Sequence, residues 1–292
     1  MTNKLPDYLS LWDYNNPGDT EKKFRRLLQQ DEIGKDIISR TVLLTQIARA
    51  QGLQRKFNDA HDTLDNVLDL LYVGNVTGRI VYLLERGRVH NSSSHPENAR
   101  PLFLQAYEES LVHGEDYYAI DAAHMLGIVE KGKNSLKWNM RAIALAETTK
   151  DARAQRWLGS LYNNTGWTFF DMKEFDIALD YFNRNIKWHT KKKSRKELIV
   201  AKWCRARTLR AMERIEESLK LQKDLLGEVE REKLEHDGYI YEEIGECLMQ
   251  LGREKESKKY FGLAYKLLSK DIWLSANEKP RLNRLKKLSD IK

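Results

Sequence analysis

The sequence predicts an all-α protein built from a row of antiparallel helix pairs, and three observations support this prediction. The chain has 292 residues but only 5 prolines, and residues that favour helices, such as Leu, Ala, Glu, Lys and Arg, are abundant. Similar residues recur at a spacing of 39 or 40 positions along most of the chain. Both ends carry shorter helical segments, and the last one has a polar side, as expected of elements that close a row of repeats.

The recurring positions define the repeat. The first set holds small residues, which let two helices approach closely: Ala48, Gly87, Gly127, Gly166, Ala206 and Gly245, separated by 39, 40, 39, 40 and 39 positions. Two sets in the following helix keep the same separations: Leu64, Phe103, Ile143, Phe182, Gln222 and Phe261, and Val67, Ala106, Ala146, Asn185, Leu225 and Ala264. One period shared by three independent positions indicates an internal repeat. Each helix pair leaves one apolar face open, so the six pairs are expected to stack in a row.

Two segments resemble the tetratricopeptide repeat, in which antiparallel helices cross at small residues and aromatic side chains fill the gaps. The clearer segment, LYNNTGWTFFDMKEFDIALDYF, covers residues 161–182 and has Gly166, Phe169, Phe175, Ala178 and Phe182 at the positions of the pattern. Residues 241–268 match with Gly245, Leu248, Gly252, Ser257, Phe261 and Ala264. The resemblance implies a right-handed α-solenoid of six such repeats with single capping helices at both ends. The period exceeds the usual length of ~34 residues, and Asn139, Ser218 and Gln222 depart from the pattern.

The repeat positions also define the expected domain organisation. We expect a short N-terminal tail over residues 1–19 and a single superhelical domain over 20–290. The expected repeats cover approximately 40–75, 79–114, 119–150, 158–190, 198–233 and 237–270. The segment TEKKFRRLL is typical of a lone second-type helix with Thr20 as its N-cap. The segment PRLNRLKKL, which starts at Pro280, predicts a C-terminal capping helix over 278–290.

Charge and cysteine content indicate the environment of the protein more than its function. The net charge of +7, from 50 Lys and Arg against 43 Asp and Glu, permits an anionic partner without identifying one. No apolar run reaches the ~18 residues that span a membrane, and the first residues lack the basic-then-apolar order of a secretory signal. Cys204 and Cys247 provide neither a metal-ligand spacing nor a disulfide framework. We therefore expect a cytoplasmic protein whose two thiols are packed and unreactive.

The motifs of enzymes and metal sites are not found in the sequence. None of the seven histidines belongs to an H-E-x-x-H pair or to another zinc spacing. The sequence has no phosphate-binding loop of the G-x-x-x-x-G-K-S/T type and no G-x-S-x-G nucleophile elbow. The glycines are explained by helix crossings and turns. The expectation is therefore a protein with no enzyme activity, no metal and no cofactor.

The resemblance also implies where a partner would bind. In this superfamily, residues three before, one after and four after the small crossing residue usually point into the concave groove. By this rule the implied partner-binding residues are Arg49, Arg88, Asn91, His124, Asn163, Trp167, Trp203, Arg207, Arg210 and Glu246, together with Phe170, Glu242 and Met249. Asn164 is added to them because it matches the middle asparagine of the clamp by which some members of the superfamily hold a peptide tail. Arginine and tryptophan are enriched at binding hot spots, and asparagine can pair with the backbone of an extended peptide. A structural interpretation competes with each assignment: the aromatic residues could be core, and Arg207 and Arg210 could be ordinary solvated helix residues.

The predicted function is a protein-interaction module or adaptor that holds a peptide or partner protein, with acidic groups, in its concave groove. The alternative is a helical repeat protein that binds RNA or another acidic partner, suggested by the basic run Lys191, Lys192, Lys193, Arg195 and Lys196. A solvated loop is the simpler explanation of this run. Repeat proteins that read RNA need regularly placed polar residues, and the variable inner positions disfavour nucleic acid. Some members of the superfamily capture the C-terminal tails of chaperones with a clamp of lysine, asparagine and arginine residues. That clamp is not expected here, because Asn164 is the only residue that matches it. The identity of the partner and the oligomeric state are left open.

Overall fold

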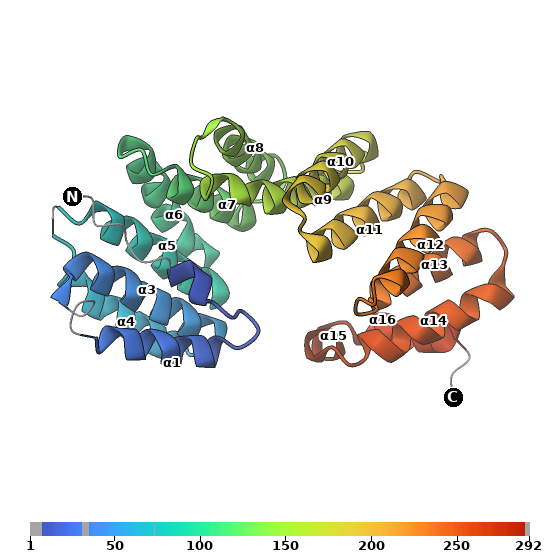
Figure 1. Ribbon diagram of the computed structural model, residues 1–292, viewed down its shortest axis with the longest axis horizontal. Helices are drawn as coiled ribbons and strands as arrows, with labels where there is room; N and C mark the ends of the chain where they lie inside the picture. The colour runs from blue at the N-terminus through green and yellow to red at the C-terminus, as the bar shows by residue number, and fades with distance from the viewer. Residues whose placement is uncertain (1–7, 31–34, 73, 290–292) are drawn as a thin grey trace. The chain divides into compact units, whose positions relative to one another are not determined.

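The computed structural model describes residues 8–30, 35–72 and 74–289, and in this part of the chain every regular element is a helix. Consecutive helices form antiparallel pairs joined by short turns (Figure 1). The predicted all-α fold class with stacked helix pairs is confirmed. The chain divides into two compact units, Met1–Leu161 and Tyr162–Lys292, and the boundary falls within helix α9 (Leu158–Asp171). The expected single domain over 20–290 stays a prediction.

The N-terminal unit starts with a 3-10 helix, η1 (Tyr8–Leu11), and helix α1 (Pro17–Leu28). Its helix pairs are α3 (Ile37–Leu53) with α4 (Phe57–Leu68), α5 (Val76–Ser92) with α6 (Pro96–Val112), and α7 (Asp116–Val129) with α8 (Gly132–Thr148). A second 3-10 helix, η2 (Ala154–Trp157), precedes α9. These bounds are consistent with the first three expected repeats.

The C-terminal unit continues the pattern with α9 and α10 (Phe175–Lys192), α11 (Arg195–Ala211) and α12 (Ile215–Arg231), and α13 (Gly238–Gln250) and α14 (Glu254–Leu268). Helix α16 (Lys279–Leu288) closes this unit, with Pro280 in its first turn. A short helix that the sequence analysis missed, α15 (Ile272–Asn277), lies between α14 and α16. Residue 290, where the domain and its capping helix were expected to end, lies outside the described residues.

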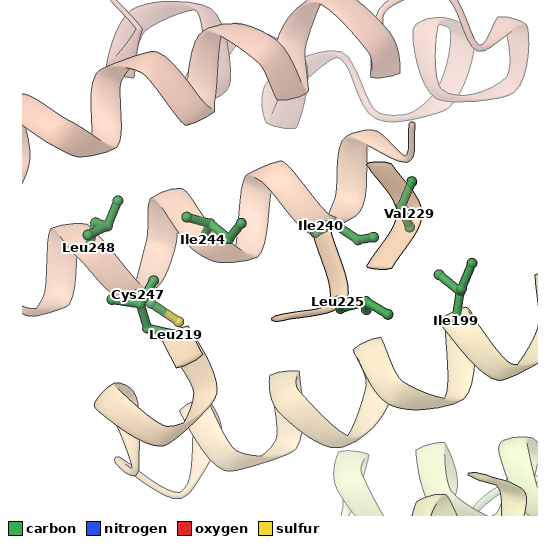
Figure 2. Packing of buried hydrophobic residues seen from close by; sticks show 8 residues of the cluster. All are labelled: Ile199, Leu219, Leu225, Val229, Ile240, Ile244, Cys247 and Leu248. Atoms are coloured by element: carbon green, nitrogen blue, oxygen red, sulfur yellow. The ribbon is translucent and has the colours of Figure 1, made fainter. Parts of the chain in front are cut away.

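Buried apolar residues from neighbouring helices form the core of each unit. In the C-terminal unit, Figure 2 shows Ile240, Ile244 and Leu248 of α13 lying over residues of α12 and α11. The cluster contains Ile199, Leu219, Leu225, Val229, Ile240, Ile244, Cys247 and Leu248, all at most 8% exposed. The open apolar face of one helix pair is thus covered by the next pair, which is the stacking that the repeat spacing implies.

Three of the small crossing residues, all of them glycines, are explained by the aromatic ring that faces each of them. A Cβ atom added to Gly166 would lie 2.6 Å from Cε1 of Phe182, and one added to Gly245 would lie 2.9 Å from Cε1 of Phe261. Gly87 and Phe103 make the same arrangement at 2.5 Å. In each case the phenylalanine follows the glycine by 16 positions. Glycine is therefore required where an aromatic ring of the second helix presses on the first helix.

Most turns between paired helices contain one residue in the left-handed region. These are Arg55 (φ 62°), Ser94 (φ 70°), Lys173 (φ 63°), Glu213 (φ 61°) and Gly252 (φ 71°). Each follows the end of a first helix, where a left-handed residue ends the helix and reverses the chain. Four of these five residues have side chains, which makes the conformation costly.

The prediction for the start of α1 was wrong. The helix begins at Pro17 with Asn16 at the N-cap position, so Thr20 lies inside the first turn and is not the cap. Proline suits this turn because its missing N–H would have no helical partner. The Thr20 hydroxyl accepts a hydrogen bond from the Asp13 backbone N–H at 3.0 Å and ties the preceding segment to the helix. The expected tail over 1–19 thus contains ordered elements from residue 8, and residues 1–7 lie outside the described residues.

Among the helices that the structure describes, none is both long and apolar enough to cross a membrane.

Candidate partner-binding site

The sequence-predicted site residues fall into two groups, one in each unit. Arg49, Arg88, Asn91 and His124 belong to the N-terminal unit, and the other predicted residues belong to the C-terminal unit. All of them lie on the first helices of their pairs. We describe the two groups separately.

Arg49 on α3 is covered by the chain's own N-terminal segment. Its guanidinium lies 5.5 Å from the ring centre of Trp12 and 5.6 Å from that of Tyr14. The Trp12 indole donates a hydrogen bond to the side chain of Gln46 at 2.9 Å, which holds the segment on α3. The two rings stack on each other, with centroids 4.9 Å apart. Arg49 is therefore already engaged in cation–π contacts within the chain.

Arg88 on α5 belongs to a buried ion-pair network. Its guanidinium binds Glu85 at 2.5 Å and also pairs with Asp121. Both carboxylates are at most 5% exposed, and the Arg88 side chain is 12% exposed. Burial lowers the pKa of Arg88, but the two carboxylates outweigh it and raise the pKa above its ordinary value. Arg88 thus stabilises the N-terminal unit, because its removal would leave the buried carboxylates of Glu85 and Asp121 without their partner.

His124 and Asn91 complete the N-terminal group. The His124 ring lies 5.1 Å from the ring of Trp157, and its Nδ1 atom is buried without a hydrogen-bond partner. Burial lowers the pKa of His124, so its neutral form is favoured. Asn91 is half-buried on α5. The N-terminal group therefore offers little unmatched polar surface for a partner.

The C-terminal group forms a continuous row of aromatic rings on three successive first helices. Trp167 on α9 lies 5.0 Å from Phe170 and 5.9 Å from Trp203 of α11. Trp203 in turn lies 5.7 Å from Tyr239 of α13 and donates a hydrogen bond to the Tyr239 carbonyl at 3.1 Å. All four side chains are half-buried. Each ring therefore contacts the core and still presents part of its surface to solvent.

Two arginines of α11 lie next to this row and share one carboxylate. Arg207 lies 5.8 Å and 5.5 Å from the ring centres of Trp167 and Trp203. Arg207 binds Glu243 of α13 at 2.7 Å, and Arg210 binds the same carboxylate at 2.7 and 3.0 Å. The Glu243 side chain is 1% exposed, whereas those of Arg207 and Arg210 are 30% and 18% exposed. Burial lowers the pKa of Arg210, but its bonds to Glu243 raise it above the ordinary value.

We call the set Trp167, Phe170, Trp203, Tyr239, Arg207 and Arg210 the aromatic–arginine face. Its charge is nearly balanced, because two guanidiniums face one buried carboxylate. Next to it, Arg281 of α16 binds Glu242 through two hydrogen bonds, at 3.0 and 2.5 Å, and Arg284 pairs with Glu246. Glu246, a predicted partner-binding residue, is therefore matched by the capping helix.

Asn163 and Asn164 lie at the α9 end of this face. The Asn163 side-chain oxygen lies 3.6 Å from the Cys204 thiol, which donates to it, and its amide lies 3.5 Å from Asn164. Cys204 and Cys247 are fully buried, as predicted. Burial raises the pKa of Cys204 to about 12 and that of Cys247 to about 11, so neither thiol is reactive at neutral pH. Both asparagines are half-buried.

The sequence analysis missed the acidic residues that bind the arginines. Glu85 and Glu243 each lie two positions before the crossing glycine of their repeat. The arginine that binds each of them, Arg49 or Arg207, comes one position after the small residue of the preceding repeat. Both pairs are separated by 36 positions, but this spacing alone does not show that the side chains of two helices meet. Tyr239 was missed because it lies six positions before Gly245, outside the rule that selected the other residues.

The described residues contain no group of His, Cys, Asp and Glu that could hold a metal ion. The exposed chemistry of the aromatic–arginine face consists of ring surface and guanidinium donors. Such a surface can bind another molecule by apolar contact, stacking and hydrogen bonding.

No family model and no curated protein matches this sequence. Solved structures with the same arrangement of helices do match. An ATPase of signal transduction with a tetratricopeptide repeat sensor, from Pyrococcus horikoshii, has a TM-score of 0.68 at 13% identity. The match covers 94% of this chain but only 42% of that chain, so this chain spans less than half of its length.

Two further structures match over nearly the whole chain. A tetratricopeptide repeat protein from Parabacteroides merdae has a TM-score of 0.53 at 16% identity, covering 97% of this chain and 96% of that one. NprR in complex with its cognate peptide NprX has a TM-score of 0.51 at 12% identity, covering 99% of this chain and 83% of that one. At these identities the likeness shows the fold alone. The chain has the tetratricopeptide-repeat fold, as its sequence pattern predicted.

Proposed function

We propose that this protein is a non-enzymatic interaction scaffold of the cytoplasm, and that its C-terminal unit binds an extended peptide segment of a partner protein. The aromatic–arginine face is the observation that carries this proposal. Its four aromatic side chains form an unbroken row across α9, α11 and α13, and all of them keep part of their surface exposed. Partly exposed Trp, Tyr and Arg are the residue types that dominate binding energy at protein interfaces.

The balance of charge narrows the chemistry of the partner. Arg207 and Arg210 share the buried Glu243, and Glu242 and Glu246 are matched by Arg281 and Arg284. The face thus has about one unmatched positive charge, which suits a peptide with apolar or aromatic side chains and a single acidic group. The expectation that the partner carries acidic groups stays a prediction, and the charge of this face favours one such group over many.

The fold supports a peptide ligand by analogy. NprR, whose fold this chain shares, has been crystallised with its cognate peptide. Similar scaffolds hold many partners, so the residues of the site must carry the argument for this chain. The rings lie on the successive first helices α9, α11 and α13. This arrangement favours an extended peptide, because alternate side chains of the peptide can contact successive helices.

A peptide array tests the proposal. We expect the full chain to select peptides with aromatic or apolar side chains and to bind them with a Kd in the micromolar range, typical of ~8 kcal/mol of binding energy. Trp203→Ala removes the central ring and should weaken binding at least ~10-fold, which is about 1.4 kcal/mol. Arg207→Met removes a guanidinium while keeping length and should weaken it by a similar factor. Charge reversal is less informative, since a glutamate at position 207 would face the buried Glu243.

Trp188→Ala provides the matched control. Trp188 is a half-buried tryptophan of α10 that lies outside the aromatic–arginine face and has Lys192 at 4.7 Å from its ring centre. Isothermal titration calorimetry of folded variants should show unchanged affinity for this control. Equal losses in Trp203→Ala and Trp188→Ala would contradict the proposed location.

The distribution of charge supports a second candidate, the binding of RNA or another polyanion. Residues Tyr162–Lys292 contain 29 of the 50 Lys and Arg and 22 of the 43 Asp and Glu, so this unit carries the whole excess of +7. An electrophoretic mobility shift with single-stranded RNA distinguishes this candidate from the first. Binding that falls steeply with added salt would favour it, and no shift at low salt would eliminate it.

A further inference from the structure

A pocket with a basic lining lies among helices α10, α11 and α12 of the C-terminal unit. Its volume is about 310 Å³, at the small end of the ~300–1,000 Å³ that is common for ligand sites. Lys202 and Arg205 of α11 form one side, and Leu225, Glu228 and Arg231 of α12 form another. Ile186 of α10 adds an apolar wall. The pocket therefore combines cations with apolar surface, the pattern of a site for a small organic molecule.

Arg205 is the unusual residue of this pocket. Its Nε atom is buried and has no hydrogen-bond partner. Among the residues that the structure describes, no carboxylate forms an ion pair with Arg205, whereas Arg207 and Arg210 of the same helix share Glu243. Arg205 is half-buried, and its Nε–H group has lost hydration without gaining an acceptor. An anion in the pocket would supply the missing charge.

The carboxylates of the pocket do not satisfy Arg205. Both oxygens of Glu228 accept hydrogen bonds from Lys202, at 2.8 and 2.7 Å, and Glu228 also binds Arg195 at 2.7 Å. Asp224 is exposed and also lines a neighbouring hollow with Lys220 and Lys223. Arg231 donates from Nε to the Gly227 carbonyl at 3.2 Å. The lining thus keeps a positive excess that comes from Arg205 and Arg231.

The pocket lies on a different side of α11 from the aromatic–arginine face. An α-helix advances by about 100° per residue, so Arg205 and Arg207 project about 160° apart around its axis. Lys202 and Arg205 face the second helices α10 and α12, whereas Arg207 binds a residue of α13. A ligand in the pocket would therefore leave the peptide face uncovered.

We propose that this pocket binds a small organic oxyanion, with the anionic group at Arg205 and Arg231 and the apolar body against Ile186 and Leu225. Phosphate monoesters and carboxylates share this chemistry, since a guanidinium fork matches both groups. This small ligand is a different molecule from the peptide of the proposed function. A variant that no longer binds the peptide, such as Trp203→Ala, should therefore still bind the small ligand.

Calorimetry with two probes that share an apolar ring tests the site on the full chain. Phenyl phosphate and benzoate carry the same ring and differ in their oxyanion, so the tighter of the two identifies the class. We expect saturable binding of at least one probe at low ionic strength, and weaker binding of inorganic phosphate, which has no apolar body. Arg205→Met should weaken binding of the better probe at least ~10-fold. The same substitution should leave the melting temperature unchanged or higher, because it removes a half-buried cation whose buried Nε atom has no hydrogen-bond partner.

Lys187→Met is the control for charge alone, since Lys187 is an exposed residue of α10 next to Ile186 that does not line the pocket. This variant should bind the probe like the wild type. Equal losses in Arg205→Met and Lys187→Met, or no saturable binding of either aromatic probe, would overturn the proposal. Arg231→Met provides a second test if Arg205→Met does not fold, and unchanged binding in that variant would also overturn it.

Discussion

At the scale of single residues, the packing of each repeat is decided by pairs of residues rather than by small residues alone. Gly87, Gly166 and Gly245 each face a phenylalanine 16 positions later. Ala48 and Ala206, at the equivalent places, are followed after 16 positions by Leu64 and Gln222. In these five repeats a bulkier crossing residue goes with the loss of the ring, which is volume compensation within a densely packed core, whereas Gly127 of the remaining repeat faces Asn139.

Gly166→Ala should therefore destabilise the C-terminal unit. The new methyl group would lie 2.6 Å from the Phe182 ring, and overpacking of this kind costs ~1–3 kcal/mol. Gly227→Ala is the matched control: nothing lies within 4 Å of the added carbon, and alanine is favoured in a helix by about 0.5–1 kcal/mol. Urea unfolding followed by circular dichroism measures both changes. No loss of stability in Gly166→Ala, or an equal loss in Gly227→Ala, would contradict the steric explanation.

The residues of the candidate site show the limit of prediction at this scale. The helix register brought Trp167, Trp203 and Arg207 to one face, and the structure has them in contact. The register did not reveal that Glu243 would neutralise the arginines. Which side chains meet across two helices depends on the rotation and offset of the helices, and these are set by packing rather than by local sequence.

At the scale of helices and turns, the chain reverses direction through costly conformations. Arg55, Ser94, Lys173 and Glu213 have positive φ angles, each in the turn of its own helix pair. In the last pair, the equivalent position is occupied by Gly252. A side chain in the left-handed region costs ~1–2 kcal/mol, which the surrounding helices must offset. Sequence analysis recognises such turns by glycine, so it detects the last one more easily than the others.

Lys173→Gly should stabilise the C-terminal unit by about 1 kcal/mol, because glycine adopts φ 63° without steric cost. Gly252→Ala should destabilise it by about the same amount, as the substituted residue would be held at φ 71°. The unfolding free energies of both variants in urea provide the measurement. A loss of stability in Lys173→Gly would show that the lysine side chain contributes more than its backbone strain costs.

The terminal elements were the least predictable helices. Asn16 and Pro17, rather than Thr20, define the start of α1, because the Thr20 hydroxyl is bonded to the Asp13 backbone. The preceding segment, expected to be a tail, packs Trp12 against Arg49 and Gln46. These contacts join residues that are 34 or more positions apart in the sequence. The repeat pattern does not predict them, because the segment before α1 is not part of a repeat.

At the scale of the whole molecule, histidine burial should make stability depend on pH. Burial is the main cause that lowers the pKa of His61, His90, His124 and His189. His61 and His90 lie 4.8 Å apart between α4 and α5, and Arg86 adds a positive charge 2.9 Å from Nδ1 of His61. The folded state thus favours neutral rings, whereas the unfolded chain binds protons at the ordinary pKa of 6.5.

The direction in which folding stability changes with pH follows from proton linkage. Stability should be highest above the unfolded pKa and should fall as the pH decreases below about 6.5, because the unfolded state then binds more protons. Differential scanning calorimetry between about pH 7.5 and about pH 5.5 should record a decreasing melting temperature. The double variant His61→Gln and His90→Gln should reduce this dependence. A melting temperature that rises towards acidic pH would contradict the linkage.

The repeat period was sufficient to predict the helix pairs, since a helix that must bury one face on its neighbours repeats its small and aromatic positions at a constant spacing. The buried thiols Cys204 and Cys247 followed from the same register. Tertiary structure alone decided how charge is distributed around those helices. It matched Arg88 with Glu85 and Asp121, bound Arg207 and Arg210 to Glu243, and left Arg205 without an acidic partner among the described residues. Ion pairing depends on distances of a few ångströms between separate helices, and sequence spacing does not determine these.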